Sequence, residues 1–127
     1  MSLVYVTIGS NDFKKSRAFY DAVMPLVGGK AGEEYEGMTF SYNLPNGTVV
    51  WIVHPHNKKP ATFGNGVTFG FGCKSADAVK KAHAAALAHG GSDEGAPGPR
   101  PDYGPNFFGA YVRDPDGNKM SFVFNGA

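Results

Sequence analysis

Cysteine is nearly absent from this chain, and so are long apolar runs. Cys73 is the only cysteine among 127 residues, which excludes an intrachain disulfide and favours a reducing, cytoplasmic setting. We expect Cys73 to be a small buried apolar residue rather than a nucleophile. Every apolar run falls short of the roughly 20 residues that a membrane span needs. The N-terminal residues lack a charged region before an apolar stretch, so we expect a strand there and no signal peptide.

Clusters of one charge are also missing. Lys and Arg total 12 and Asp and Glu total 11, so the formal net charge is +1. The longest run of basic residues is two. A nucleic-acid or membrane partner would require a basic patch or arm, so neither partner is expected.

Glycine and proline, in contrast, are frequent, and they separate periodic segments. The 18 glycines and nine prolines fall where a sheet protein needs turns. Alternation of apolar and polar residues predicts strands over 3–9, 38–43, 48–53, 66–73, 107–113 and 118–124. The length fits a single domain over 1–127.

Two helices are predicted from their caps and apolar faces. Asn11 or Asp12 begins the first, and Ser75 begins the second, which runs to about His89. The expected apolar face of the first consists of Phe13, Phe19, Ala22, Val23 and Leu26. That of the second consists of Val79, Ala82, Ala86 and Leu87.

The order strand–helix–strand–strand occurs twice, in halves of about 1–57 and 64–127, with a linker over 54–65. Residues 4–10 align with 67–73 at an offset of 63, whereas the turn 44–47 aligns with 114–117 at an offset of 70. The difference of seven predicts an inserted loop within 94–105. Two such halves sharing one continuous sheet could bury a core that neither could bury alone.

Alternation also separates the two faces of these strands. One face is uniformly apolar and is expected to pack against the helices. The other is mixed and carries Tyr5, Thr7, Thr68, Gly70, Lys119 and Ser121. Two interpretations stay open: a solvated sheet face, or the lining of a cleft formed by a curled sheet.

The segments 10–29, 64–105 and 111–124, the last with its Asp-Pro-Asp-Gly-Asn turn, resemble the glyoxalase/bleomycin-resistance/extradiol-dioxygenase superfamily, also called vicinal oxygen chelate. The resemblance implies an α+β fold with two βαβββ modules forming a curled mixed half-barrel sheet, and helices on its outer face. It also implies a short extra strand near 29–36, and homodimers.

Members of this family typically hold a divalent metal through His, Gln or Glu. The resemblance and the internal repeat place the four ligand positions on Tyr5, Trp51, Thr68 and Ser121. Phenol, indole and hydroxyl groups are poor ligands for zinc, iron or nickel near neutral pH, so we expect no metal cofactor. His54 and His56 have strand-like spacing, but His54 is expected to point away from the face of Trp51.

A cleft without metal could still bind a small molecule. The candidate ligand-binding residues are Tyr5, Trp51, Thr68, Ser121, Tyr111, Lys119, Arg100 and Tyr103, the last two in the inserted loop. Asp114 and Asp116 are interpreted as turn formers rather than an acid/base pair. No catalytic residue is assigned, and whether the chain is an enzyme stays undecided.

Three functions remain open. The preferred one is a metal-independent binding protein for a small-molecule ligand. The first alternative is a metal-dependent lyase similar to lactoylglutathione lyase, or a dioxygenase, of the same superfamily. The second is a degenerate, non-catalytic interaction subunit.

Overall fold

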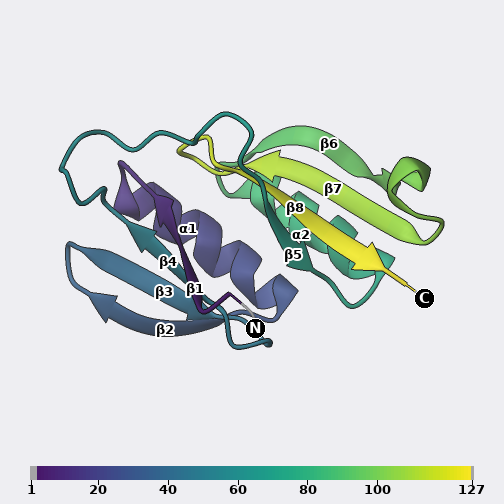
Figure 1. Cartoon of the computed structure of the whole chain (residues 1–127), viewed down its shortest axis with the longest axis horizontal. Coiled ribbons are helices and arrows are strands. Elements are labelled where there is room, and N and C mark those ends of the chain that lie inside the picture. Colours follow the sequence, from purple (N-terminus) through teal and green to yellow (C-terminus); the bar gives the residue numbers. More distant parts are fainter. Residues whose placement is uncertain (1–2, 127) are drawn as a thin grey trace.

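The computed structural model describes residues 3–126 and contains two similar modules (Figure 1). The first consists of β1 (Tyr5–Gly9), α1 (Phe13–Val23), η1 (Met24–Val27), β2 (Lys30–Tyr35), β3 (Thr39–Asn43) and β4 (Val49–Val53). The second consists of β5 (Phe69–Gly72), α2 (Ala76–Ala88), β6 (Ser92–Pro99), η2 (Pro101–Tyr103), β7 (Phe107–Arg113) and β8 (Lys119–Asn125). The predicted βαβββ repeat is confirmed, including the extra strand β2.

Each module forms its own four-stranded mixed sheet. The strand orders are β1-β4-β3-β2 and β5-β8-β7-β6. In both, the first strand pairs in parallel with the last, and the other pairs are antiparallel. The prediction of one continuous sheet within the chain is wrong, because β1 and β5 are edge strands of separate sheets. The sheets stay open, which is consistent with a curled half-barrel.

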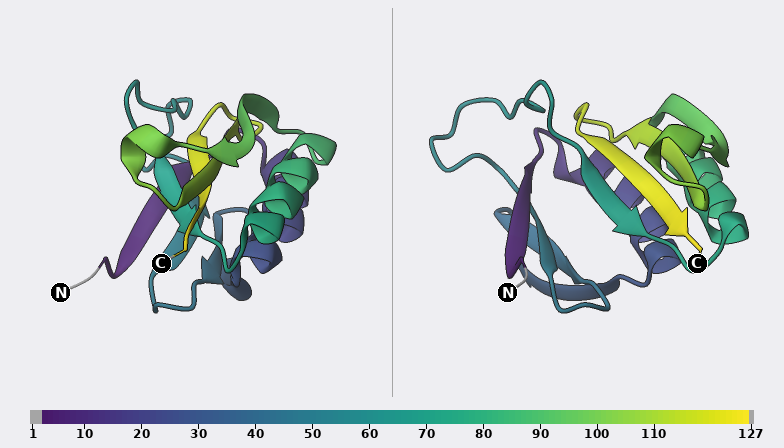
Figure 2. Two further views of the ribbon diagram at one scale, coloured as in Figure 1. Left: turned by 90° about the vertical axis from the view of Figure 1, so that its right-hand side faces the viewer. Right: turned by 45° about the vertical axis from the view of Figure 1, so that its right-hand side comes forward.

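The helices join the two modules. Both lie on the same side of the strands (Figure 2), and they contact each other. Asp12 caps α1 by accepting from the backbone nitrogen of Lys15 at 3.1 Å, and Ser75 caps α2 by accepting from that of Ala78 at 3.0 Å. The predicted caps are therefore confirmed, with Asp12 rather than Asn11 at the first helix.

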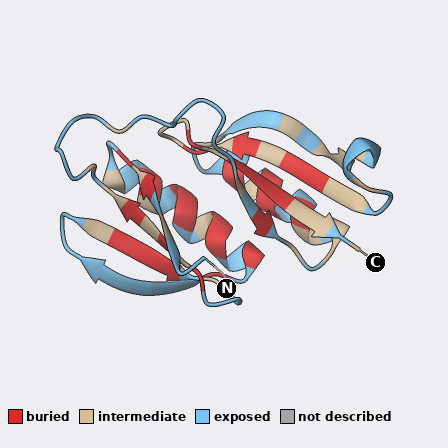
Figure 3. Ribbon diagram, viewed as in Figure 1, coloured by how far each residue is buried: buried red, intermediate tan, exposed pale blue. Residues whose placement is uncertain are grey.

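One hydrophobic core runs through both modules. Phe19 and Val23 from α1 and Val79 and Ala82 from α2 are fully buried in it, together with the alternate residues of the inner strands. Buried positions concentrate along α1 and the inner strands, whereas the outer strands β2 and β6 are mostly exposed (Figure 3). A single core makes the chain one structural unit.

Two residues of the predicted helix faces are exposed instead. Leu26 lies in η1, where the tighter three-residue turn rotates it away from the face of α1. Leu87 follows the buried Ala86, and one residue along a helix is a rotation of about 100°. Tyr20 of α1 and His83 of α2 are buried although the sequence placed neither on an apolar face, and the His83 side chain contacts Asp93.

Half of the predicted inserted loop is strand. Residues 94–99 belong to β6, the edge strand that pairs with β7 through two register shifts. Pro97 and Pro99 are compatible with this position, since an edge strand leaves one row of backbone groups unpaired. Residues 100–106, including η2, form the remaining loop.

A buried polar cluster fastens α1 to the turn between β7 and β8. The Tyr20 hydroxyl and Asn118 Nδ2 donate to Asp114 Oδ2, at 2.5 and 2.9 Å. The backbone nitrogens of Asp116 and Asn118 donate to Oδ1 of the same carboxylate, both at 2.9 Å. Asn118 Nδ2 also donates to the carbonyl of Gly9 at 2.9 Å. Burial raises the pKa of Asp114, and burial together with Asp114 raises the pKa of Tyr20.

Candidate functional site

The first module presents an aromatic surface centred on Trp51. In the sheet, Trp51 lies beside Thr7 of β1 and opposite Ser41 of β3. Tyr35, at the end of β2, stacks on the indole with ring centroids 6.3 Å apart and planes at 17°. We call this surface the Trp51 face; it consists of Tyr5, Thr7, Tyr35, Ser41 and Trp51.

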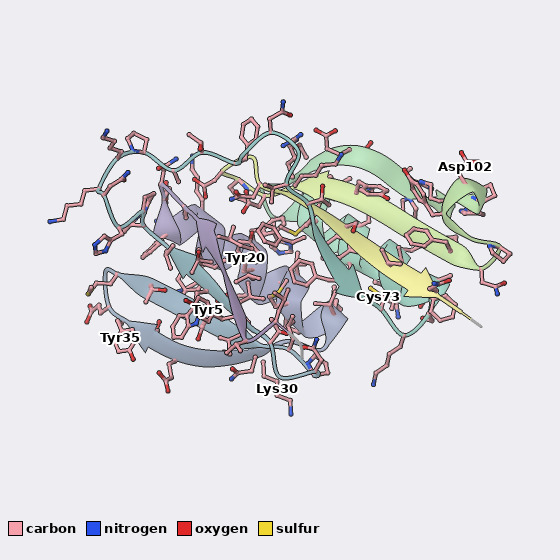
Figure 4. The ribbon with its side chains drawn as sticks, in the orientation of Figure 1. Tyr5, Tyr20, Lys30, Tyr35, Cys73 and Asp102 are labelled. Atoms are coloured by element: carbon pink, nitrogen blue, oxygen red, sulfur yellow. The ribbon has the colours of Figure 1, made fainter. Side chains whose placement is uncertain are left out.

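Most of the Trp51 face is open to solvent. Tyr5 is 58% and Tyr35 54% exposed, and Trp51 is half-buried. Tyr5 and Tyr35 come from opposite edges of this sheet (Figure 4). The sequence interpretation missed Tyr35, because strand β2 was expected only from the resemblance and its register was not assigned. A register shift interrupts the alternation within β2, so the sequence pattern does not show which face of the sheet Tyr35 is on.

The second module presents a different surface, centred on Tyr111 of β7. Tyr111 lies opposite Ser121 of β8, and Ser121 lies beside Gly70 of β5. A methyl group added at Gly70 would lie 3.3 Å from the Ser121 hydroxyl oxygen, so the glycine leaves space beside that hydroxyl, although Ser121 as a whole is buried.

Two cationic side chains flank the Tyr111 ring. Lys119 Nζ lies 5.5 Å and Arg100 Cζ 5.7 Å from the ring centroid. Because Lys119 starts β8 and Arg100 follows β6, they approach from the two strands on either side of β7. Both distances fall within the range of cation–π contacts. We call this surface the Tyr111 face; it consists of Arg100, Phe107, Tyr111, Lys119 and Ser121.

The backbone of β6 makes room for Arg100. Its guanidinium folds back over the strand and donates to the carbonyls of Ala96, Gly98 and Pro99, at 2.8, 2.9 and 3.3 Å. A Cβ at Gly95 would lie 3.1 Å from the Tyr111 ring and 3.3 Å from Arg100. The glycines of β6 therefore allow the arginine and the tyrosine to approach each other.

Tyr103 and Thr68 occupy other positions. Tyr103, in η2, is 66% exposed and meets Phe107 edge-on at 5.4 Å, at the rim of the Tyr111 face. Thr68 precedes β5 and lines a pocket of about 210 Å³ between the modules, with Val6 and Leu44 among its neighbours. The predicted ligand-binding residues therefore form two groups on two sheets, with Thr68 apart.

The residues at the family's ligand positions do not form a donor set that fits a divalent metal. Tyr5, Trp51, Thr68 and Ser121 supply a phenol, an indole and two hydroxyls. Within residues 3–126, no group of three or more His, Cys, Asp or Glu side chains is arranged to hold a metal ion.

The histidines have other contacts. His54 stacks on Phe13 of α1 at 3.9 Å with planes at 9°, so it lies on the helix side and not with Trp51. His83 Nε2 lies 2.9 Å from Asp93 Oδ1, and this hydrogen bond lowers the pKa of Asp93. His89 Nδ1 lies 2.8 Å from the carbonyl of Ala85, one turn back in α2.

A pocket of about 580 Å³ lies between α1 and the hairpin of β2 and β3, and Tyr35 of the Trp51 face is among its lining residues. Phe13 and Phe40 line this pocket, and so does the ion pair of Arg17 with Glu34. Arg17 also lies over the Phe40 ring at 4.4 Å. The charges of this pair are satisfied by each other, so the pair leaves no net charge to select a ligand.

Comparison with known proteins identifies the family. A model of the Glyoxalase/Bleomycin resistance protein/Dioxygenase superfamily matches residues 2–122. A glyoxalase/bleomycin resistance protein from Albidiferax ferrireducens T118 is 36% identical, with 98% of each chain covered and a TM-score of 0.88. No curated protein matches the chain. Among residues 3–126, no helix is both long and apolar enough to cross a membrane.

More distant structures share the fold. A glyoxalase-related enzyme from Fulvimarina pelagi is 20% identical, covering 98% of this chain and 88% of its own, with a TM-score of 0.79. A lactoylglutathione lyase from Agrobacterium tumefaciens is 16% identical, covering 97% of this chain and 92% of its own, with a TM-score of 0.67.

Proposed function

The chain belongs to the glyoxalase/bleomycin resistance protein/dioxygenase superfamily, and we propose that within it the chain is a metal-independent binding protein for a small molecule. The observation that carries the proposal is the chemistry of the four family ligand positions, Tyr5, Trp51, Thr68 and Ser121, which offer surfaces and hydroxyls rather than metal donors. The lone cysteine supports a cytoplasmic setting for this activity.

Both faces have the features of a ligand surface. The Trp51 face supplies stacked aromatic rings, and the Tyr111 face supplies an aromatic ring between two cations. Aromatic groups with a few placed polar groups are typical of small-molecule sites. The lyase from Agrobacterium tumefaciens is too distant for its activity to be transferred, since at 16% identity it supports the fold alone.

We further propose that the binding protein is a homodimer. Within its sheet, β1 is an edge strand that pairs only with β4, so its other edge is free of any strand of that sheet. Leu3 and Val4, just before β1, are 67% and 75% exposed. The chain's accessible surface is 7,530 Å², against about 6,500 Å² expected for a compact monomer of its mass. Pairing β1 with the β5 edge of a second copy would place a Trp51 face and a Tyr111 face on one surface.

A dimer should therefore dissociate when a charge is placed on this edge. Val4→Lys is expected to shift the protein to monomer in sedimentation equilibrium, because a buried lysine at an edge-to-edge contact is costly. Met38→Lys, at a turn residue that is 67% exposed, is the matched control and should stay dimeric. A monomeric wild type would contradict the dimer proposal.

Ligand binding should be visible at Trp51, which is the only tryptophan. We expect small aromatic compounds to change its fluorescence and to raise the melting temperature, because a ligand that binds only the folded state stabilises it. Zinc, nickel, iron and manganese salts are expected to leave the melting temperature unchanged.

The alternatives give different results in the same screen. A rise in melting temperature with a metal, or near-stoichiometric metal in protein purified without chelator, would overturn metal independence and support the lyase or dioxygenase. No response to any compound would support an interaction subunit instead.

A further inference from the structure

We propose that the ligand is an organic carboxylate whose charged group is bound by Lys119 and Arg100 on the Tyr111 face. The inference rests on the proposed function and names the chemical class of its ligand. Its basis is two cations that lie 5.5 and 5.7 Å from the centroid of one aromatic ring and have no acidic partner in the described part of the chain.

The other two arginines of the chain are neutralised. Arg17 pairs with Glu34, and Arg113 pairs with Glu94 at 2.6 Å. Arg113 is on the same strand as Tyr111, two residues further along, so the difference arises within one sheet. In the described part of the chain, neither Arg100 nor Lys119 forms an ion pair with a carboxylate. The Tyr111 face therefore carries uncompensated positive charge.

Both cations also retain hydrogen-bond donors. Arg100 has five N–H groups, and three of them donate to carbonyls of the β6 segment. Across residues 3–126, no hydrogen bond uses the ammonium group of Lys119, which has three donors. Two cations with unused donors, one from each strand beside β7, give the surroundings of Tyr111 the positive charge and the donors that attract an oxyanion.

The surroundings favour an organic acid over an inorganic anion. Lys119 and Tyr111 are half-buried, and Phe107 lies two residues before Gly109 on the same face of β7. An ion in a half-buried setting is less screened than one in bulk solvent. A phosphate ion would meet the charges but leave the rings of Tyr111 and Phe107 uncovered, whereas an aromatic acid would contact both. The ligand class is thus a carboxylate on a flat apolar body.

A pair of probes with the same shape separates charge from shape. Phenylacetate and phenylacetamide differ in their charge and not in their ring. We expect phenylacetate to bind the full-length protein at least tenfold more tightly, measured by chemical-shift titration of ¹⁵N-labelled protein, with the largest shifts at Tyr111, Lys119 and Ser121. Raising salt should weaken phenylacetate binding and leave phenylacetamide unchanged.

Lys119→Met tests the residue directly. The variant keeps most of the aliphatic length, and it orphans no acceptor among residues 3–126, because none of them is bonded to the ammonium. It should weaken phenylacetate about tenfold without changing phenylacetamide, and Lys119→Arg should restore most of the loss. Lys80→Met is the matched control: Lys80 Nζ lies over the Phe108 ring at 5.9 Å, on the helix side of the same sheet. It should bind both probes as wild type does.

The outcomes separate this inference from the proposed function. Equal affinity for the two probes would overturn the carboxylate inference and leave small-molecule binding standing. Tighter phenylacetate binding that Lys119→Met does not weaken would overturn the assignment to this face. Inorganic phosphate competing as strongly as phenylacetate would overturn the organic class. If neither probe shifts the Tyr111 face, the inference fails, and the broader compound screen decides the function by itself.

Discussion

Replacing Asp114 by alanine is expected to lower the free energy of unfolding by about 3–5 kcal/mol, because it breaks a buried network around a carboxylate. The carboxylate accepts four hydrogen bonds, from Tyr20, from the Asn118 side chain and from two backbone nitrogens. Asp114 is only 4% exposed, so water cannot readily replace it. Each donor left without a partner in a buried place costs about 1–3 kcal/mol.

Urea denaturation followed by circular dichroism measures this loss. Asp77→Ala is the matched control, since the Asp77 side chain is 72% exposed and pairs with Lys81 at 3.2 Å on the helix surface. The control should lose less than about 1 kcal/mol. If the two variants proved equally stable, the cluster would not hold α1 to the second module.

The repeat could be predicted from sequence because its signals are local. The two turns that separate the last strands use the same hydrogen bonds: Gly47 nitrogen donates to the Leu44 carbonyl, and Gly117 nitrogen to the Asp114 carbonyl. Both glycines have positive φ angles, 92° and 88°, which other residues rarely adopt. Glycine at the same place in both halves is visible in the sequence, and so are the caps Asp12 and Ser75.

What could not be predicted depends on residues far apart in the chain. Tyr20 and Asp114 are separated by 94 residues, so the sequence identified the turn but not its partner in α1. The stack of Tyr35 on Trp51 needs the register of three strands, one of which contains a shift. Arg100 reaches Tyr111 only because glycines in β6 clear its path. The alternation of apolar and polar residues along a strand shows which face of the sheet a side chain is on. Its neighbours on that face depend on the register between strands.

Each module has a turn before its last strand that lies beside the other module, and the repeat makes these two turns equivalent. The two contacts between the modules, here called joints, nevertheless differ in chemistry. At one, the Asp114 turn meets α1 through hydrogen bonds. At the other, Leu44 and Pro45 of the matching turn line a pocket of about 250 Å³ with Gly72 at the end of β5. A polar joint specifies one geometry, whereas an apolar joint adds burial without direction. Phe19 lies in the core that both modules share, and its removal tests whether the modules depend on each other.

Phe19→Ala is expected to lower the free energy of unfolding by about 3–5 kcal/mol, because it removes a fully buried aromatic ring and leaves a cavity. The ring belongs to α1, yet its Cε2 atom lies 2.8 Å from where a Cβ on Gly91, just after α2, would be placed. It therefore contacts both modules, and both should lose stability together in a single transition. Phe63→Ala, at a ring that is 46% exposed, is the control and should lose about 1 kcal/mol or less. Two separate unfolding transitions in the variant, seen by Trp51 fluorescence and by circular dichroism, would show that the modules do not share one cooperative core.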